Sequence, residues 1–195
     1  MKNFILLLIT IFLTSCETAV VEEVATNGEP EGPHTSAEWK IWAYSTAAPS
    51  FIAAECTVID TDGTVLREGT NGWKDPHEAM PMVGDAASFA WLQGFMAGTV
   101  PDVEVDGWAW MLHGDIGEDN RMYLVTDEEG IAKAKADGQW IESGAHLMLF
   151  PADPSTLDGQ TTDFNSGAPY VMYAGTKYAH LMIPVEGYYD YQAKQ

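Results

Sequence analysis

Apolar and polar residues alternate with a period of two through most of the chain after residue 37. This alternation is typical of strands that bury one face. The expected strands are residues 39–44, 51–59, 64–68, 108–113, 122–125, 145–150, 170–174 and 178–185. A hairpin turn, Asp60-Thr61-Asp62-Gly63, separates two of them, and because Asp-Gly favours tight turns we expect its flanking strands to pair antiparallel.

Two segments have helical spacing instead. The first is capped by Asp85 and ends before Gly98, with apolar residues three and four positions apart. The second opens with a capping-box pattern at residues 126–129 and stops at Gly138. Short strands interrupted by two helices predict an α+β fold: a single domain, with a mainly antiparallel sheet and about two helices on one face.

The N-terminal run differs from the rest because residues 4–13 are apolar apart from Thr10, and small residues follow before Cys16. This layout is typical of a secretory signal, and it is shorter than the ~20 residues of a membrane-spanning helix. Leu13-Thr14-Ser15-Cys16 resembles the lipobox of bacterial lipoproteins. The resemblance implies that residues 1–15 are a signal peptide and that Cys16 carries acyl chains such as palmitate and anchors the chain to a membrane.

Residues 16–36 are acidic, contain Pro and Gly, and have few large apolar side chains, so we expect a disordered tether. The globular domain would then occupy residues 37–195. Glu17 follows the lipidated position where some lipoprotein families carry an Asp that retains them at the inner membrane. The resemblance therefore favours a bacterial cell-envelope location at the outer membrane, on its periplasmic or surface face.

The negative net charge of the chain restricts the classes of molecule that it can bind. The chain has 29 acidic and 9 basic residues, for a formal net charge of −20. Such a field repels nucleic acid and anionic lipid and attracts cations, so we expect a small ligand or a cation rather than a polyanion. The only cysteine besides Cys16 is Cys56, whose neighbours alternate as in a strand, and we expect a buried structural thiol.

Several segments resemble a group of uncharacterised exported bacterial proteins. They are Ile41-Trp42-Ala43-Tyr44-Ser45-Thr46-Ala47-Ala48-Pro49, Val65-Leu66-Arg67-Glu68-Gly69-Thr70-Asn71-Gly72-Trp73 and Tyr178-Ala179-His180-Leu181-Met182-Ile183-Pro184-Val185. The resemblance covers much of the domain and implies kinship without an assigned activity.

One tetrapeptide, Ala-His-Leu-Met, occurs at residues 145–148 and again at 179–182. Because residues two apart share a strand face, each copy places an imidazole beside a thioether. If the strands are neighbours, the side chains that converge are His146, Met148, His180 and Met182, with His113 as an additional candidate. These ligand types suit copper or zinc, and His-x-Met resembles the terminal motif of periplasmic copper chaperones. Gap-filling methionines and backbone-bonded histidines on a packed face are the alternative.

A second candidate site is Met111-Leu112-His113-Gly114-Asp115, where a strand ends in an acidic loop. His113 and Asp115 would form a base with its orienting carboxylate, or the loop would bind a hard cation through oxygen ligands. The usual sequence signatures of hydrolases and nucleotide-binding proteins are missing. A solvated acidic loop is the alternative.

A third candidate site consists of tryptophan side chains, since the chain contains seven tryptophan residues. Trp108 and Trp110 share a strand face and would stack ligand rings such as sugars, although the same spacing also serves a core. The sequence therefore predicts a lipid-anchored envelope binding protein, more readily a binding protein than an enzyme, with a soft-metal site on a His/Met face. The alternatives are an enzyme using His113 and Asp115 or a structural or glycan-contacting accessory lipoprotein.

Overall fold

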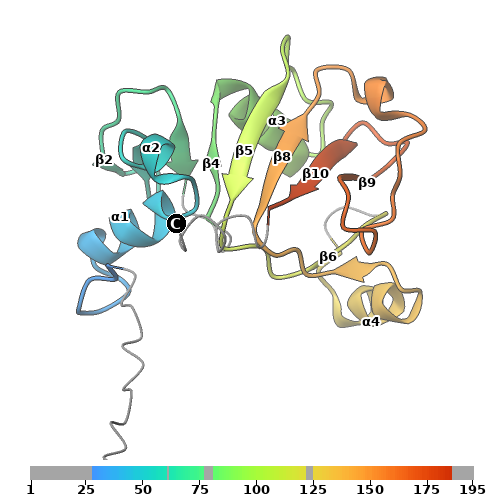
Figure 1. The fold of residues 1–195 in the computed structure, drawn as a ribbon, viewed down its shortest axis with the longest axis horizontal. Helices are drawn as coiled ribbons and strands as arrows, with labels where there is room; N and C mark the ends of the chain where they lie inside the picture. Colours follow the sequence, from blue (N-terminus) through green and yellow to red (C-terminus); the bar gives the residue numbers. More distant parts are fainter. Residues whose placement is uncertain (1–27, 61, 77–80, 122–124, 186–195) are drawn as a thin grey trace, which may run out of the picture.

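An eight-stranded sheet forms the centre of the computed structural model, which describes residues 28–60, 62–76, 81–121 and 125–185 (Figure 1). Its strands are β1 (Thr57–Ile59), β2 (Val65–Arg67), β3 (Lys74–Pro76), β4 (Val83–Gly84), β5 (Gly107–Met111), β8 (His146–Phe150), β9 (Tyr170–Met172) and β10 (His180–Pro184). They are arranged in the order β2-β1-β3-β4-β5-β8-β10-β9. Every neighbouring pair is antiparallel except β1 and β3, which are parallel.

A two-stranded sheet and the helices surround this sheet. The smaller sheet pairs β6 (Glu118–Asp119) with β7 (Trp140–Ile141). The helices are α1 (Ala37–Ser45), α2 (Ser50–Ala53), α3 (Ala86–Met96), α4 (Glu128–Ala136) and the short 3-10 helix η1 (Pro154–Leu157). Within the described residues, no helix is long and apolar enough to cross a membrane.

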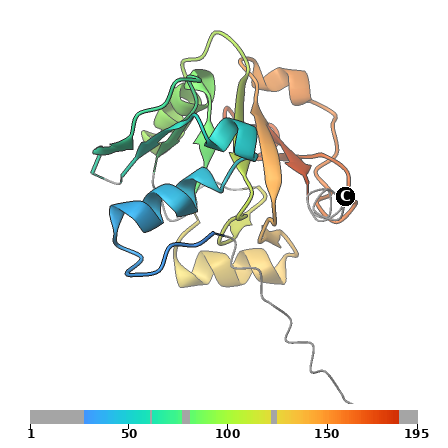
Figure 2. The same ribbon diagram turned by 60° about the vertical axis from the view of Figure 1, so that its left-hand side comes forward.

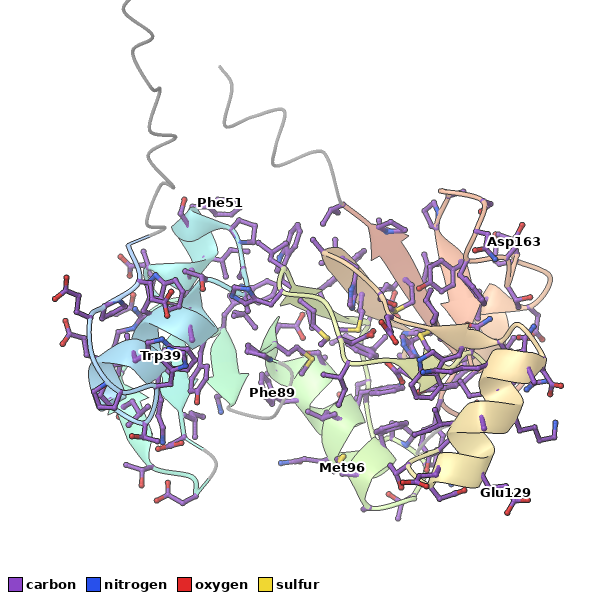
Figure 3. The ribbon with its side chains drawn as sticks, turned by 90° about the horizontal axis from the view of Figure 1, so that it is seen from below. Trp39, Phe51, Phe89, Met96, Glu129 and Asp163 are labelled. Atoms are coloured by element: carbon purple, nitrogen blue, oxygen red, sulfur yellow. The ribbon has the colours of Figure 1, made fainter. Side chains whose placement is uncertain are left out.

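The sheet has two different faces, which we call inner and outer. The inner face packs against α3, and the outer face points toward the side that carries α1 and α2 (Figures 1 and 2). Figure 3 shows Phe51 of α2 on one side of the sheet and Phe89 of α3 on the other. The inner core consists of Met82, Trp91, Ala109, Met111, Met148, Phe150, Tyr170, Met172, Tyr173, Tyr178 and Met182. A second core beneath α1 and α2 contains Tyr44, Ile52, Cys56, Val58 and Val83 with small alanines.

Residues at the start of α3 fix its position on β5. The Asp85 carboxylate accepts hydrogen bonds from the backbone N–H groups of Ser88, at 2.8 Å, and Trp108, at 3.0 Å. One side chain therefore caps the helix and attaches it to the strand. Gly107 allows this close approach, because a Cβ there would lie 2.3 Å from the Ser88 nitrogen. Gly107, Ala109 and Met111 consequently face α3, and Trp108 and Trp110 face outward.

The α+β fold and the mainly antiparallel sheet are confirmed. So are both predicted helices, α3 and α4, and the antiparallel hairpin of β1 and β2. The helices are spread more widely than expected, since α3 covers the inner face, α1 and α2 lie over the opposite face, and α4 contacts β6 and β7. Cys56 is fully buried, as expected, and its thiol donates to the Ala53 carbonyl.

Two strand predictions were wrong. Residues 39–44 belong to α1, because Ser36 caps the Trp39 nitrogen at 3.2 Å and the helix packs beside β1, β2 and β3. Aromatic and β-branched residues favour strands only weakly, and this tertiary packing outweighs that preference. Residues 51–59 divide into α2, which follows Pro49, and β1. In the predicted strand 122–125, residues 122–124 lie outside the described residues.

The described part of the segment assigned to the tether contacts α1. The His34 ring stacks on Trp39 with ring centroids 4.2 Å apart, and Glu29 accepts a hydrogen bond from the Trp39 indole N–H at 2.8 Å. Residues 28–36 therefore contact the first helix of the domain.

The outer edge of β9 is occupied by the chain itself. The backbone N–H of Val171 donates to the Thr161 carbonyl at 2.8 Å, and that of Tyr173 donates to the Asn120 carbonyl at 2.9 Å. These two donors point away from β10, so loops of the same chain satisfy them.

The contact between α3 and β5 provides a test of the fold. We expect Gly107→Ala to lower the free energy of unfolding by about 2 kcal/mol, because the new methyl group would overlap the backbone at Ala87 and Ser88. Urea unfolding followed by circular dichroism measures this change. An unchanged midpoint would contradict the close packing of α3 on β5.

Candidate functional site

The predicted His/Met set lies on the inner face of two neighbouring strands. β8 and β10 pair with Met148 directly opposite Met182 and with His146 opposite Pro184. The two thioethers therefore form a cross-strand pair. The two histidines lie at opposite ends of it, four positions apart in register, or about 13 Å along the strands.

Both imidazoles of the His/Met set are close to backbone carbonyl oxygens. Nδ1 of His146 lies 2.6 Å from the Gly144 carbonyl oxygen, and Nδ1 of His180 lies 3.0 Å from the Tyr178 carbonyl oxygen. Each Nδ1 is thus engaged by the carbonyl two residues before it, and the register places the two histidines on either side of the methionine pair. A metal ion needs nitrogen ligands at ~2 Å, so this arrangement does not bring the four side chains into one ligand set.

The surroundings of His180 are aromatic. Its ring contacts those of Trp91, Phe150 and Tyr173, with centroids 5.3–5.4 Å apart. Burial, together with the nearby His146, lowers the pKa of His180 to about 4, although its bond to the Tyr178 carbonyl acts in the opposite direction. His180 is therefore neutral at physiological pH. In the described part of the chain, no group of three or more His, Cys, Asp or Glu side chains is arranged to bind a metal.

The predicted His113 and Asp115 pair is also separated by its hydrogen bonds. Nε2 of His113 lies 2.8 Å from the Thr46 hydroxyl and 3.2 Å from the Ala43 carbonyl, at the end of α1. The Asp115 carboxylate accepts instead from the Gly117 and Ser143 backbone N–H groups, at 3.0 and 2.9 Å. His113 thus bonds to the C-terminal end of α1, and Asp115 bonds to backbone N–H groups of neighbouring loops. Both interactions stabilise the fold.

The outer face carries the predicted Trp108 and Trp110. Trp108 is 37% exposed, whereas Trp110 packs against the core beneath α1. Register places Trp108 in a row with Leu149 and Leu181, and Trp110 in a row with Leu147 and Ile183. These four aliphatic side chains are half-buried and belong to neither core cluster. The outer face of β5, β8 and β10 is therefore apolar and partly exposed.

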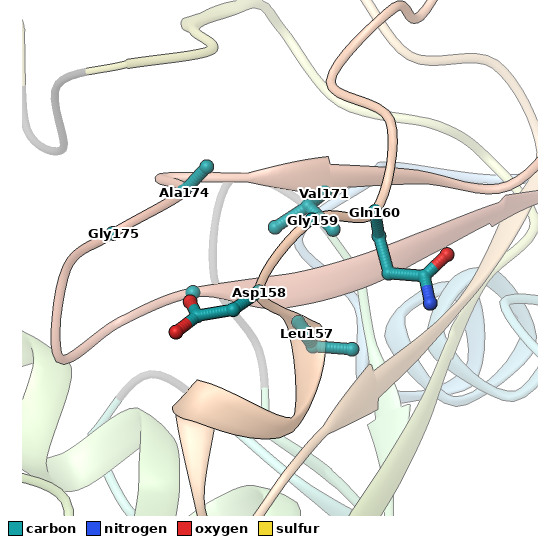
Figure 4. Close-up of a pocket in the computed structure, with 8 residues that line it drawn as sticks. Leu157, Asp158, Gly159, Gln160, Val171, Ala174 and Gly175 are labelled. Carbon is teal, nitrogen blue, oxygen red and sulfur yellow. The ribbon is translucent and has the colours of Figure 1, made fainter.

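A small pocket borders this face at β9. It has a volume of about 110 Å³ and lies between η1 and the β9–β10 turn (Figure 4). Its lining residues are Leu157, Asp158, Gly159, Gln160, Val171, Ala174, Gly175 and Ala179. Val171 lies opposite Leu181 in register, so the pocket continues the row that begins at Trp108.

The structure also reveals a polar cluster that the sequence did not suggest. The Tyr173 hydroxyl donates to the Glu118 carboxylate, and Ser143 is hydrogen-bonded to the Tyr170 hydroxyl at 3.1 Å. Burial raises the pKa of Glu118 to about 7, the Tyr173 bond opposes that rise, and the Asp115 charge adds to it. Burial likewise raises the pKa of Tyr170 to about 12 and shifts that of Tyr173 upward.

Tyr173 adopts an unusual backbone conformation for a large side chain. Its φ of 54° lies in the left-handed region, which costs energy and persists only where surrounding contacts enforce it. Those contacts are the hydroxyl bond to Glu118 and the backbone bond to Asn120. Glu118 and Tyr173 are 55 residues apart in sequence, and only the acidic loop at 115–120 marked this region beforehand.

Comparison with known proteins yielded no match to a family model, a curated protein or a solved structure.

The buried Glu118 predicts a specific pH dependence. The folded-state pKa of the Glu118 carboxyl exceeds its usual 4.5. Its contribution to stability is therefore fully present below pH 4.5 and is lost as the pH rises through about 7. His180 acts oppositely. Because its pKa is lowered, the stability that it contributes rises as the pH increases from about 4 to 6.5 and is fully present above that range. We expect the stability advantage of the unsubstituted chain over Glu118→Gln to shrink by on the order of 2 kcal/mol between pH 4.5 and 7.5.

Urea unfolding of both proteins at intervals of half a pH unit measures this difference. Glu129→Gln, on an exposed position of α4, is the matched control and should track the unsubstituted chain throughout. A constant difference between Glu118→Gln and the unsubstituted chain would show that Glu118 titrates normally.

Proposed function

We propose that this chain is a lipid-anchored protein of the bacterial cell envelope and that its folded domain binds a partner through the outer face of β5, β8 and β10. One observation carries the proposal: Trp108, Leu149 and Leu181 form a partly exposed apolar row across three strands. Antiparallel sheets that face water on one side normally alternate apolar and polar residues. In β5, β8 and β10 the outward-facing residues are apolar as well as the inward-facing ones, which favours a binding partner that covers the outer face.

Other features support binding over the alternatives from sequence. The two histidines of the His/Met set are four positions apart in register and bonded to backbone carbonyls, and His113 is bonded to the end of α1. The Glu118 cluster has acid–base potential, but Tyr173 is 1% exposed, so its hydroxyl offers little access to a substrate. Trp108 is the one large side chain of the predicted candidate sets that combines exposure with apolar neighbours on adjacent strands.

The lipid anchor rests on Leu13-Thr14-Ser15-Cys16. We expect mass spectrometry of the chain produced in a bacterium that processes lipoproteins to show Cys16 as the first residue, with a diacylglyceryl adduct. Cys16→Ala should abolish the adduct and release the domain from the membrane fraction. A natively produced chain that still begins at Met1 would contradict the anchor.

Occupation of the outer face is testable by cysteine accessibility. We expect Leu149→Cys and Leu181→Cys to react with a small maleimide at least ten times more slowly in isolated envelopes than in purified protein. Cys56 is fully buried, so its background labelling is low. Labelling is followed by a gel-mobility shift.

Val65→Cys is the matched control, because Val65 is 44% exposed on β2, at the opposite edge of the sheet. It should react at the same rate in both preparations. Equal rates in both preparations for the two outer-face cysteines would overturn the proposed binding surface.

A further inference from the structure

We propose that the occupant of the outer face is a basic polypeptide segment, whose apolar side chains pack on the leucine rows and whose Lys or Arg side chains meet acidic residues near both ends of the row that begins at Trp108. This inference rests on the proposed function and names the partner class. It follows from the distribution of charge around the face.

Basic residues are missing from the part of the chain that builds this region. Residues 75–120 and 136–176 contain neither Lys nor Arg, and these segments include β4, α3, β5, β8, η1 and β9. β10 also lacks both residue types. The strands of this region and η1 therefore carry no positive side chain to neutralise its carboxylates. Lys177 in the β9–β10 turn donates to the Gly98 carbonyl at 2.8 Å, and Lys40 of α1 is paired with Asp60.

Carboxylates gather at one end of the face. Asp106 directly precedes β5 and accepts a hydrogen bond from the Ala152 backbone N–H at 2.9 Å, which joins the loop before β5 to the loop after β8. Asp153 follows in that second loop, and Glu104 lies two residues before Asp106. All three are exposed, and the Trp108 row begins two residues after Asp106. We call Glu104, Asp106, Asp153 and Asp158 the acidic rim.

Asp158 extends the rim to the other end of the same row. It lines the pocket beside Val171, which pairs with Leu181. The row from Trp108 to Val171 thus has acidic groups near both of its ends, and its centre is aliphatic. An extended segment with alternating basic and apolar residues matches this pattern, because one set packs on the row and the flanking cations reach the rim. The exposed Trp108 ring offers a further contact for a cation.

Other occupants fit less well. A second copy of this chain would bring another formal charge of −20 against the same rim. Nucleic acid and anionic lipid are repelled for the same reason. A small organic ligand would need a cavity of roughly 300 Å³ or more, whereas the pocket at β9 measures about 110 Å³.

Synthetic peptides test the partner class. The probe is a fluorescent octapeptide of alternating Leu and Lys, titrated with the full chain in phosphatidylcholine nanodiscs, with empty nanodiscs as the blank. An alternating Ser/Lys peptide keeps only the charge, and an alternating Leu/Glu peptide keeps only the apolar period. We expect the Leu/Lys peptide to bind at least ten times more tightly than either, measured by fluorescence anisotropy.

Substitutions locate the binding surface. Leu149→Lys should weaken Leu/Lys binding at least tenfold, whereas Val65→Lys, which adds the same charge on β2, should weaken it less than twofold. Glu104→Gln combined with Asp158→Asn should weaken it about fivefold and flatten its salt dependence. Trp108→Ser is the second variant of the apolar row, for use if Leu149→Lys melts below the temperature of the assay.

The outcomes separate the two proposals. Equal binding of the Leu/Lys and Leu/Glu peptides, abolished by Leu149→Lys, would overturn the basic partner and leave the outer face as a binding surface. Equal binding of the Leu/Lys and Ser/Lys peptides would also overturn this inference, because the apolar rows would then add nothing. Binding that Leu149→Lys and Trp108→Ser both leave unchanged would overturn the inference and the proposed surface together.

Discussion

The close approach of α3 to β5 determines which face of the sheet each residue of β5, β8 and β10 occupies. Asp85 bonds both the helix and the strand, and Gly107 leaves room for the backbone at Ser88. Since side chains alternate along a strand, placing Gly107 and Ala109 beneath the helix turns Trp108 outward. The register of β5 with β8 and of β8 with β10 then carries the same parity across the sheet. The apolar outer face is thus a geometric consequence of the packing of α3 against Gly107 and Ala109.

Much of this arrangement was readable from local patterns. Strict alternation identified β8 and β10, and the Asp85 cap and the capping-box pattern at residues 126–129 identified α3 and α4, although the residue that caps α4 is Asp127. Local patterns failed at α1, whose aromatic residues look like a strand until Ser36 is recognised as a cap and the helix is packed on its neighbours. Both copies of Ala-His-Leu-Met lie in strands, as predicted, and the structure shows that these strands are neighbours, but their antiparallel register brings only the methionines together.

The buried cluster lay beyond such reasoning because its members come from distant segments. Glu118 belongs to β6 and Tyr173 follows β9, and their hydroxyl–carboxyl bond connects the small sheet to the edge of the large one. Removing a carboxyl from water is unfavourable, and here the protein limits that cost by keeping Glu118 partly protonated near neutrality. The neutral His180 contacts the same tyrosine ring. Glu118, whose pKa is raised, and His180, whose pKa is lowered, therefore both contact Tyr173. Their contributions to the free energy of unfolding change in opposite directions with pH and offset each other at mildly acidic pH.

The capped edge of β9 constrains how any partner can be recognised. Sheets commonly capture peptides by adding a strand at an open border, where main-chain groups provide much of the affinity. At β9 the Val171 and Tyr173 donors are already taken by Thr161 and Asn120. Strand addition at that border would first have to displace contacts that the chain makes with itself. Recognition through side chains lying flat across the pleats requires no such displacement, and its selectivity would then depend on shape and charge more than on backbone pairing.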